Sequence, residues 1–253
     1  MARIAILHPG EMGAAVGGCL VQAGHDVVWV AAGRSPASRR RADAAGLRAV
    51  ESLGGCDVVL SICPPAAAVD TARALGRFRG VYVDANAISP RTADTVADLV
   101  AAGGADFVDG SVIGPPPRQA GTTRLYLAGP RAAEVAGLFR GSRLAAPVLD
   151  VPGRSASALK MTYGAWTKIG AALLLAARAT AEQQGVGAAL DAEWLLSQPE
   201  LPGRLAQAVA AATAKGWRWD DEMRQIAETF AEAGQPAGFG DAAAEMFGRY
   251  PRP

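Results

Sequence analysis

The sequence predicts an α/β fold, in which a doubly wound parallel sheet is followed by an all-α second domain. Up to residue 150, short apolar runs alternate with Ala-rich segments, and the runs are rich in β-branched residues without polar alternation. Strands that are buried on both faces of a parallel sheet have this pattern. After Val151-Pro152-Gly153 the apolar runs stop and every segment has a helical pattern. We therefore expect one domain at residues 1–152 and a second at 153–253.

The expected elements of the first domain follow from this alternation, because an apolar run followed by Gly or Pro marks the end of a strand. Strands are predicted at residues 4–7, 27–30, 58–62, 81–84, 107–108, 125–128 and 148–150. Helices are predicted between most of them, at residues 12–23, 37–45, 67–75, 91–102 and 132–139.

The second domain is expected to begin with one long helix over residues 154–184, which is rich in Ala and Leu and ends at Gly185. This helix would connect the two domains. Shorter helices are predicted after it, separated by Pro and Gly turns, at residues 191–196, 203–214, 220–233 and 241–250.

Composition excludes several classes of protein. The net charge of +1 gives no electrostatic reason to bind nucleic acid or an anionic membrane. The three cysteines have no C-x-x-C spacing, and two histidines offer little to a metal site or a Ser-His-Asp triad. The chain opens directly on an apolar run, and its most apolar helical stretch, residues 169–177, is too short to span a bilayer. We expect a soluble cytoplasmic protein that binds a small molecule.

A Gly-rich turn, HPGEMG at residues 8–13, lies between the first strand and the first helix. Gly10 and Gly13 have the spacing of the second and third glycines of G-x-G-x-x-G, where the backbone approaches a pyrophosphate and helix packs on strand. His8 replaces the first glycine, and Pro9 after it favours an extended backbone at residue 8. The turn predicts dinucleotide binding; an ordinary βα turn is the alternative. The cofactor-binding residues would be His8, Pro9, Gly10, Glu11, Met12 and Gly13.

The segment after the second strand distinguishes between NADP and NAD. An acidic residue there would bind the ribose hydroxyls of NAD, but WVAAGRSPASRRR contains none. Arg34, Ser35 and Arg39 could instead surround a 2′-phosphate with charge-assisted hydrogen bonds. The alternative is a basic, solvated helix start. We expect NADP, with NAD as the less favoured cofactor.

Another loop is expected at the same edge of the sheet, because the carboxyl ends of parallel strands meet there. Cys63, Pro64 and Pro65 follow the strand predicted at residues 58–62. They are interpreted either as one wall of the cofactor site or as a rigid loop.

The chain resembles the β-hydroxyacid dehydrogenase superfamily, which includes 3-hydroxyisobutyrate and 6-phosphogluconate dehydrogenases and, more distantly, imine reductases. HPGEMG is similar to the GxGxMG of that family, and VDGSVIGPPPRQAGTTRLYLAGP is similar to its substrate segment. ALKMTYGAWTKIGAALLLA and RWDDEMRQIAETFAEAG resemble a branch with a phosphogluconate-dehydrogenase-like C-terminal domain of unknown function. The resemblance implies a Rossmann domain, a long interdomain helix and an all-α domain that helps to form a homodimer.

The resemblance also implies site residues. Lys160 matches the helix lysine of the family, the acid/base candidate, and Tyr163 shares its helix face. Lys160 would handle the proton while hydride passes between NADPH and a small hydroxy or keto compound. Tyr163 and Lys168 are alternative donors. Asn86 would lie near the nicotinamide ribose, and the residues near the substrate would be Ser111, Ile113, Gly114, Gly164 and Glu222.

The chain departs from the family at three of these places. Ile113 replaces a substrate-binding Ser, Gly164 replaces an Asn, and the Asp221-Glu222 pair stands where Lys-Asp is common. A pocket with fewer polar anchors leaves two alternatives to a hydroxyacid dehydrogenase open: an imine reductase, or a non-catalytic protein that binds the cofactor.

Overall fold

The computed structural model describes residues 1–252, and the chain divides into two compact units, Met1–Lys160 and a second unit that begins at Met161. The division lies within helix α6 (Ser155–Gly164) and not at the Pro-Gly turn near residue 152. The first residues of α6 are hydrogen-bonded to a strand of the sheet, which explains why they group with the first unit.

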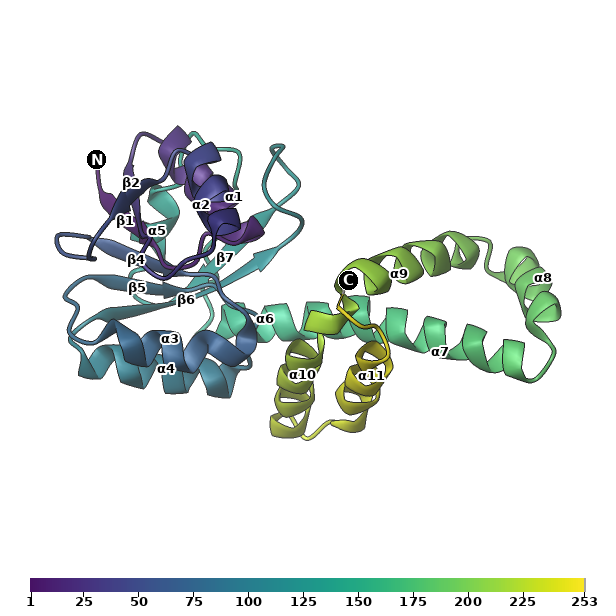
Figure 1. Ribbon diagram of the computed structural model, residues 1–253. Helices are drawn as coiled ribbons and strands as arrows, with labels where there is room; N and C mark the ends of the chain where they lie inside the picture. Colours follow the sequence, from purple (N-terminus) through teal and green to yellow (C-terminus); the bar gives the residue numbers. More distant parts are fainter. Residues whose placement is uncertain (253) are drawn as a thin grey trace. The chain divides into compact units, whose positions relative to one another are not determined.

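The first unit contains a seven-stranded sheet with the order β3-β2-β1-β4-β5-β6-β7 (Figure 1). Its strands are β1 (Arg3–Ile6), β2 (Asp26–Val30), β3 (Arg48–Val50), β4 (Val58–Ser61), β5 (Val81–Asp84), β6 (Asp106–Ile113) and β7 (Arg124–Ala128). β1 to β6 pair in parallel, whereas β7 is antiparallel to β6. The predicted doubly wound α/β fold is confirmed, with one antiparallel strand added at the edge.

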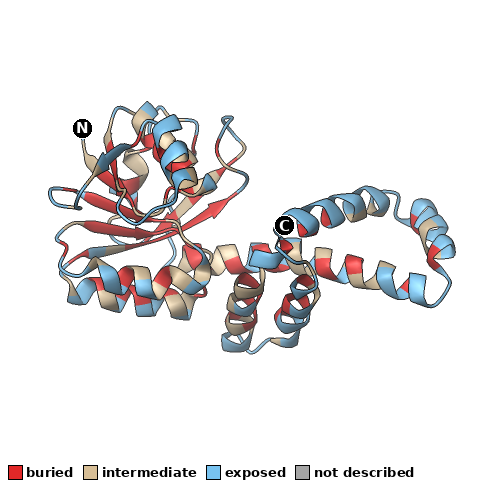
Figure 2. Cartoon of the chain, viewed as in Figure 1, coloured by how far each residue is buried: buried red, intermediate tan, exposed pale blue. Residues whose placement is uncertain are grey.

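Helices cover both faces of this sheet (Figure 1). One face packs α1 (Glu11–Gln22), α2 (Pro36–Ala44) and α5 (Ala132–Gly137), and the other packs α3 (Ala68–Leu75) and α4 (Pro90–Ala102). Most strands between them are largely buried, and the edge strand β3 is the exception (Figure 2). A short 3₁₀ turn, Pro65–Ala67, leads into α3. Burial on both faces is why the strands read as unbroken apolar runs.

Two of the strand predictions for this unit were wrong. The edge strand β3 was missed, because its residues Arg48 and Ala49 are exposed and form no apolar run. Residues 148–150 were predicted as a strand but make only an isolated bridge, between Leu127 and Val148. Pro147 and Pro152 flank that segment, and proline has no N–H to extend a ladder.

The second unit is all helical within the residues that the structure describes. The predicted single helix over residues 154–184 is interrupted: a π-helical turn, Ala165–Ile169, separates α6 from α7 (Gly170–Gln183). The remaining elements are α8 (Gly187–Ser197), α9 (Leu201–Lys215), a 3₁₀ turn at Gly216–Arg218, α10 (Asp220–Glu232) and α11 (Gly238–Gly248). Such π turns are often found at functional sites.

The core of the second unit is formed largely by α10 and α11, whose buried side chains include Met223, Ile226 and Phe247. Gly240 allows the two helices to approach closely, because a Cβ there would lie 2.7 Å from the carbonyl oxygen of Met223. Trp219 meets Phe247 edge to face, with ring centroids 4.8 Å apart. Across residues 1–252 we find no helix that is both long and apolar enough to cross a membrane.

Candidate functional site

The strand order reverses direction between β1 and β4, and ligands of open α/β sheets bind outside the carboxyl ends of the strands at such a point. The turn at residues 8–13 follows β1, and Cys63, Pro64 and Pro65 follow β4. The amide of Leu7 donates to the carbonyl oxygen of Leu60 at 3.1 Å, which joins the two strand ends. The fold thus brings these two predicted segments to the same place.

The turn after β1 has the backbone geometry of an open anion cradle. Gly10 is the N-cap of α1, and a Cβ added there would meet nothing within 4 Å. A Cβ at Gly13 would lie 2.2 Å from the carbonyl oxygen of His8, so only glycine fits. Since the N-terminal N–H groups of a helix favour negative charge, the space over Gly10 fits the diphosphate of a dinucleotide. Glu11 is exposed and Met12 is half-buried on the first turn of α1.

His8 is half-buried at this turn, and its Nδ1 is buried without a hydrogen-bond partner. Burial, together with the positive charge of Arg34, lowers the pKa of His8 to about 4. The imidazole is therefore neutral at physiological pH.

Arginines from the segment after β2 hold the carbonyl groups of the turn. Arg34 Nη2 donates to the carbonyl oxygen of Leu7 at 3.3 Å, and Arg41 Nε donates to that of Pro9 at 3.1 Å. The role of Arg41 was missed; the run of three arginines at residues 39–41 was the available signal.

The other two residues predicted to bind a 2′-phosphate have structural contacts of their own. Ser35 caps α2 by accepting from the amide of Ser38 at 3.2 Å. The guanidinium of Arg39 lies 5.9 Å from the ring centroid of Trp29. Arg34 and Ser35 are both exposed next to the cradle.

A buried polar network lies at the ends of β4 and β5. The amide oxygen of Asn86 accepts from the Cys63 N–H at 2.6 Å, and its Nδ2 donates to Ser61 Oγ at 3.2 Å and to Asp84 at 2.8 Å. Asn86 therefore ties the Cys63 loop to β5. The pKa of Asp84 is raised to about 7, mainly by burial. The negative charge of Asp109 raises this pKa further, and the hydrogen bonds from Asn86 lower it. Sequence reasoning identified Cys63 and Asn86 but missed Ser61 and Asp84.

Lys160 is held against strand β6 by α6. Its Nζ donates to the carbonyl oxygen of Val112 at 2.9 Å. Nearer the start of α6, a second contact joins it to β6. Asp109 of β6 accepts hydrogen bonds from the amides of Ala156 and Ser157 and from Ser157 Oγ. Asp109 thus caps the start of α6. Sequence reasoning missed it, although an acid between the apolar Val108 and Gly110-Ser111 was a visible signal.

Three predicted substrate residues lie at the end of β6. Ser111 is fully buried and its Oγ has no hydrogen-bond partner, and Ile113 is also buried. Gly114 has φ of +122°, and a Cβ there would lie 2.3 Å from the carbonyl oxygen of Thr122. The turn after β6 therefore requires glycine at this position for a structural reason.

The second unit brings Gly164 and Glu222 together. A Cβ at Gly164 would lie 3.6 Å from Glu222 Oε1, which is buried and has no hydrogen-bond partner. Glu222 Oε2 accepts from Lys168 Nζ, which also lies 5.2 Å from the Trp219 ring centroid. Tyr163, in contrast, is 47% exposed.

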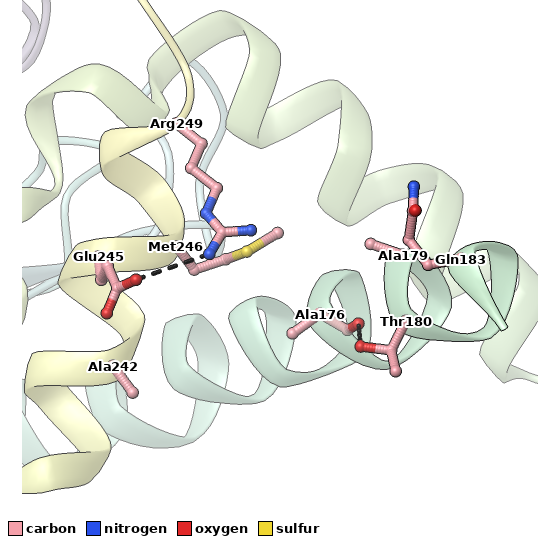
Figure 3. A pocket seen from close by; sticks show the side chains of 8 residues that line it. All are labelled: Ala176, Ala179, Thr180, Gln183, Ala242, Glu245, Met246 and Arg249. Atoms are coloured by element: carbon pink, nitrogen blue, oxygen red, sulfur yellow. Dashed lines mark hydrogen bonds and ion pairs between the residues drawn. The ribbon is translucent and has the colours of Figure 1, made fainter.

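Two hollows in the surface lie away from these residues. One, of about 400 Å³, is formed by α7 and α11 in the second unit, where Arg249 pairs with Glu245 at 3.6 Å (Figure 3). The other is lined by residues before β4 and before β5, at the amino ends of the strands. Neither contains a predicted site residue. Within residues 1–252, no three His, Cys, Asp or Glu side chains are grouped to hold a metal ion.

Comparison with known sequences gives a match at the C-terminus: DUF1932, a domain of unknown function, matches residues 181–250. No curated protein matches the chain.

Solved structures match almost the whole chain. A conserved hypothetical protein from Sinorhizobium meliloti 1021 is 27% identical, with 98% of this chain and 87% of that one covered and a TM-score of 0.73. A conserved protein of unknown function, described as structurally similar to 3-hydroxyacid dehydrogenases, is 26% identical over 98% and 96% of the two chains, with a TM-score of 0.74.

Enzymes with the same fold match at lower identity. The 3-hydroxyisobutyrate dehydrogenase of Salmonella typhimurium is 19% identical over 98% and 93% of the chains, with a TM-score of 0.71. A reductive aminase from Aspergillus terreus, solved with NADPH, has a TM-score of 0.58 at 18% identity. The C-terminal match and the fold along nearly the whole chain both support the resemblance of this chain to the β-hydroxyacid dehydrogenase superfamily.

Proposed function

We propose that this protein is an NADP-dependent oxidoreductase that transfers hydride between NADPH and a small hydroxy or keto compound. The observation that carries the proposal is the cradle at the carboxyl ends of β1 and β4. There, Gly10 leaves the start of α1 open, Gly13 allows the helix to pack closely against the His8 carbonyl group, and Arg34 lies beside the turn. Relatives with this fold include dehydrogenases and reductases. We further propose that the protein works as a homodimer.

The residues present fit a dinucleotide. The diphosphate would lie over Gly10, where no side chain intrudes. The exposed Arg34 and Ser35, with Arg39 on the following helix, would hold a 2′-phosphate. No acidic residue follows β2 in the WVAAGRS segment to accept the ribose hydroxyls of NAD. When bound, the nicotinamide would donate or accept the hydride.

The part of the protein in the reaction is to hold and move a proton. In the reductive direction the substrate carbon gains a hydride and its oxygen gains a proton, which Lys160 would supply. The hydrogen bond from Nζ to Val112 fixes the position of the amine at the end of β6. Asn86 would support the cofactor from the neighbouring strand end, where its side chain is already locked by Ser61, Cys63 and Asp84.

Imine reduction is a second candidate, and one feature of the helical unit favours it. Glu222 carries a carboxylate oxygen without a partner beside Gly164, where relatives often have Asn. Lys168 pairs with the other oxygen of this carboxylate, so the unpartnered oxygen would act on an iminium cation as a hydrogen-bond acceptor and not as an isolated charge. Reductive aminase and imine reductase structures share the fold.

The test has two stages. NADPH and NADH binding would be measured by calorimetry, and NADPH would then be incubated with ketones, semialdehydes and cyclic imines while loss of its absorbance is followed. We expect tighter binding of NADPH than of NADH and turnover with at least one class. Binding without any turnover would support a non-catalytic cofactor-binding protein, and no binding of either cofactor would overturn the proposal.

Arg34→Ala tests the choice of cofactor. It should weaken NADPH binding about tenfold or more and change NADH binding little, since a lost charge-assisted hydrogen bond costs this much. Arg40→Ala is the matched control, because Arg40 is exposed on α2 and no role is proposed for it. Equal effects of the two variants would contradict a 2′-phosphate site at Arg34.

A further inference from the structure

His8 is the main departure of the cradle from its family pattern, and its two ring nitrogens have different surroundings. Nδ1 is buried and has no hydrogen-bond partner. The ring as a whole is only half-buried, at the end of β1 beside the open space over Gly10. The side chain therefore has one nitrogen, Nδ1, enclosed by protein. The other nitrogen, Nε2, remains available for a hydrogen bond to a ligand.

This asymmetry determines the tautomer. A neutral imidazole carries one N–H, and an N–H enclosed at Nδ1 would lose its hydration without gaining an acceptor. A proton on Nε2 avoids that cost and leaves only a lone pair at the enclosed nitrogen. Burial and the charge of Arg34 keep the ring neutral by lowering its pKa to about 4.

The backbone around His8 is rigid enough to aim the ring. The carbonyl oxygen of His8 accepts from the Gly10 amide at 2.7 Å, and Pro9 restricts the backbone of residue 8. Arg34 and Arg41 fix the carbonyl groups of Leu7 and Pro9 on either side. The Gly10 amide is thereby directed to the carbonyl oxygen of His8, so an additional donor from a side chain would help to hold an anion at this turn.

We propose that His8 is a cofactor-positioning residue, held as the Nε2–H tautomer, which donates from Nε2 to a diphosphate oxygen of the dinucleotide. This inference rests on the proposed function. It gives the diphosphate a side-chain donor at the position where the usual fingerprint has its first glycine, which has no side chain.

The chain is well suited to a test by nuclear magnetic resonance, because it has two histidines. His25 is an internal reference: its Nδ1 accepts from the Ala2 amide at 3.2 Å, and its Nε2 contacts the Leu138 carbonyl oxygen at 2.9 Å. Both rings should therefore show the Nε2–H pattern of ¹⁵N shifts in the free protein. Added NADPH should shift the Nε2 resonance of His8 and leave that of His25 unchanged.

Variants give a second readout. His8→Ala should weaken NADPH binding about tenfold, as expected for a hydrogen bond to a charged group. His8→Gln retains an N–H donor at a similar reach and should restore most of the affinity. Circular dichroism would verify that both variants fold.

The outcomes separate this inference from the function on which it rests. If the wild-type protein binds NADPH but the His8 resonance does not move, or His8→Ala binds as tightly, the role of His8 is overturned and the cofactor site stands. A His8 ring with its proton on Nδ1 would also overturn it. If the wild-type protein binds no dinucleotide, both proposals fail.

Discussion

At the scale of one residue, Lys160 makes a structural contact in addition to the chemical role that we propose for it. β5 ends opposite Asp109 of β6, so the later residues of β6 have no parallel neighbour on that side. Lys160 provides a partner for the Val112 carbonyl in that region. A loss of activity on removing Lys160 would therefore not by itself show that it transfers a proton.

Two substitutions at Lys160 separate these roles. Lys160→Met should lower kcat about 100-fold or more, the usual contribution of a general acid, and leave the Kd for NADPH nearly unchanged. Lys160→Arg keeps a donor for Val112 but does not release its proton near neutral pH, so it should fold normally and remain as inactive. Kinetics on a substrate found in the panel, with thermal melting as the folding control, would measure both effects.

The chain offers a clean control for this experiment, because it has only three lysines. Lys215 is exposed near the end of α9, and Lys215→Met should have wild-type activity. Full activity in Lys160→Arg would instead assign Lys160 a structural role and direct attention to Lys168.

Asp84 should make stability depend on pH in an unusual direction. Its pKa is about 7 in the folded protein and 3.8 ordinarily, with burial as the main cause. Between these values the folded state holds a proton that the unfolded state lacks, so stability falls as pH rises through this window and stays low above it. Asp84→Asn cannot titrate and should remove this slope.

Thermal melting between pH 5 and 8 measures the effect. The wild-type Tm should fall relative to that of Asp84→Asn by a few degrees, at about 2–4 °C per kcal/mol for a chain of this size. The slope is the quantity to compare, because Asn at this position also loses a hydrogen bond with the donors of Asn86. Parallel melting curves for the two proteins across the range would rule out an elevated pKa for Asp84.

At the scale of elements, the clamp between β6 and α6 is the feature that positions Lys160. Asp109 is 1% exposed and accepts all three of its hydrogen bonds from the first turn of α6. An anion at a helix N-terminus is favourable in itself. Lys160 and Val112 also join α6 to β6. The Asp109 cap and the Lys160 hydrogen bond together therefore fix the position of α6 along β6.

Removing the Asp109 carboxylate should lower the free energy of unfolding more than removing the Ser157 hydroxyl that donates to it. Asp109→Ala leaves two buried amides and the Ser157 hydroxyl unpaired and should lower the free energy of unfolding by about 2–4 kcal/mol. Ser157→Ala removes one hydrogen bond and should cost about 1 kcal/mol. Urea denaturation gives both values, and Ser155→Ala, whose hydroxyl donates to the carbonyl oxygen of Val151 four residues before it, is the control. An Asp109→Ala variant as stable as the control would show that α6 does not need the cap.

The elements that could be predicted from sequence are those whose packing requires a continuous pattern. β1, β4 and β5 are buried on both faces and appear as apolar runs, whereas β3 is an exposed edge and has no such run. The π turn at Ala165–Ile169 has no recognisable sequence signature. For the site, glycine spacing indicated the cradle, but Asp84, Asp109 and Arg41 act through contacts between residues far apart in sequence, which periodicity does not reveal.

At the scale of the whole chain, the helical unit carries several large apolar side chains that are exposed to solvent. Leu173 on α7 is 70% exposed, and Leu195 and Leu196 on α8 are 66% and 82% exposed. Exposed apolar surface of this kind marks interaction sites. The Rossmann unit, in contrast, carries all the proposed cofactor residues within Met1–Lys160.

Because the exposed leucines and the proposed cofactor residues lie in different units, substitutions in the helical unit should change dimer formation without changing cofactor binding. A Leu173→Glu, Leu196→Glu double variant should convert a wild-type dimer to a monomer in sedimentation experiments, because two charges would be buried at the contact. Gln207→Glu adds an acid at an exposed polar position of α9 and should leave the dimer intact. The monomeric variant should still bind NADPH, since the cradle lies in the other unit, and lose turnover if the substrate site needs both subunits. A wild-type protein that sediments as a monomer at micromolar concentration would contradict the dimer, and the exposed leucines would then need another partner.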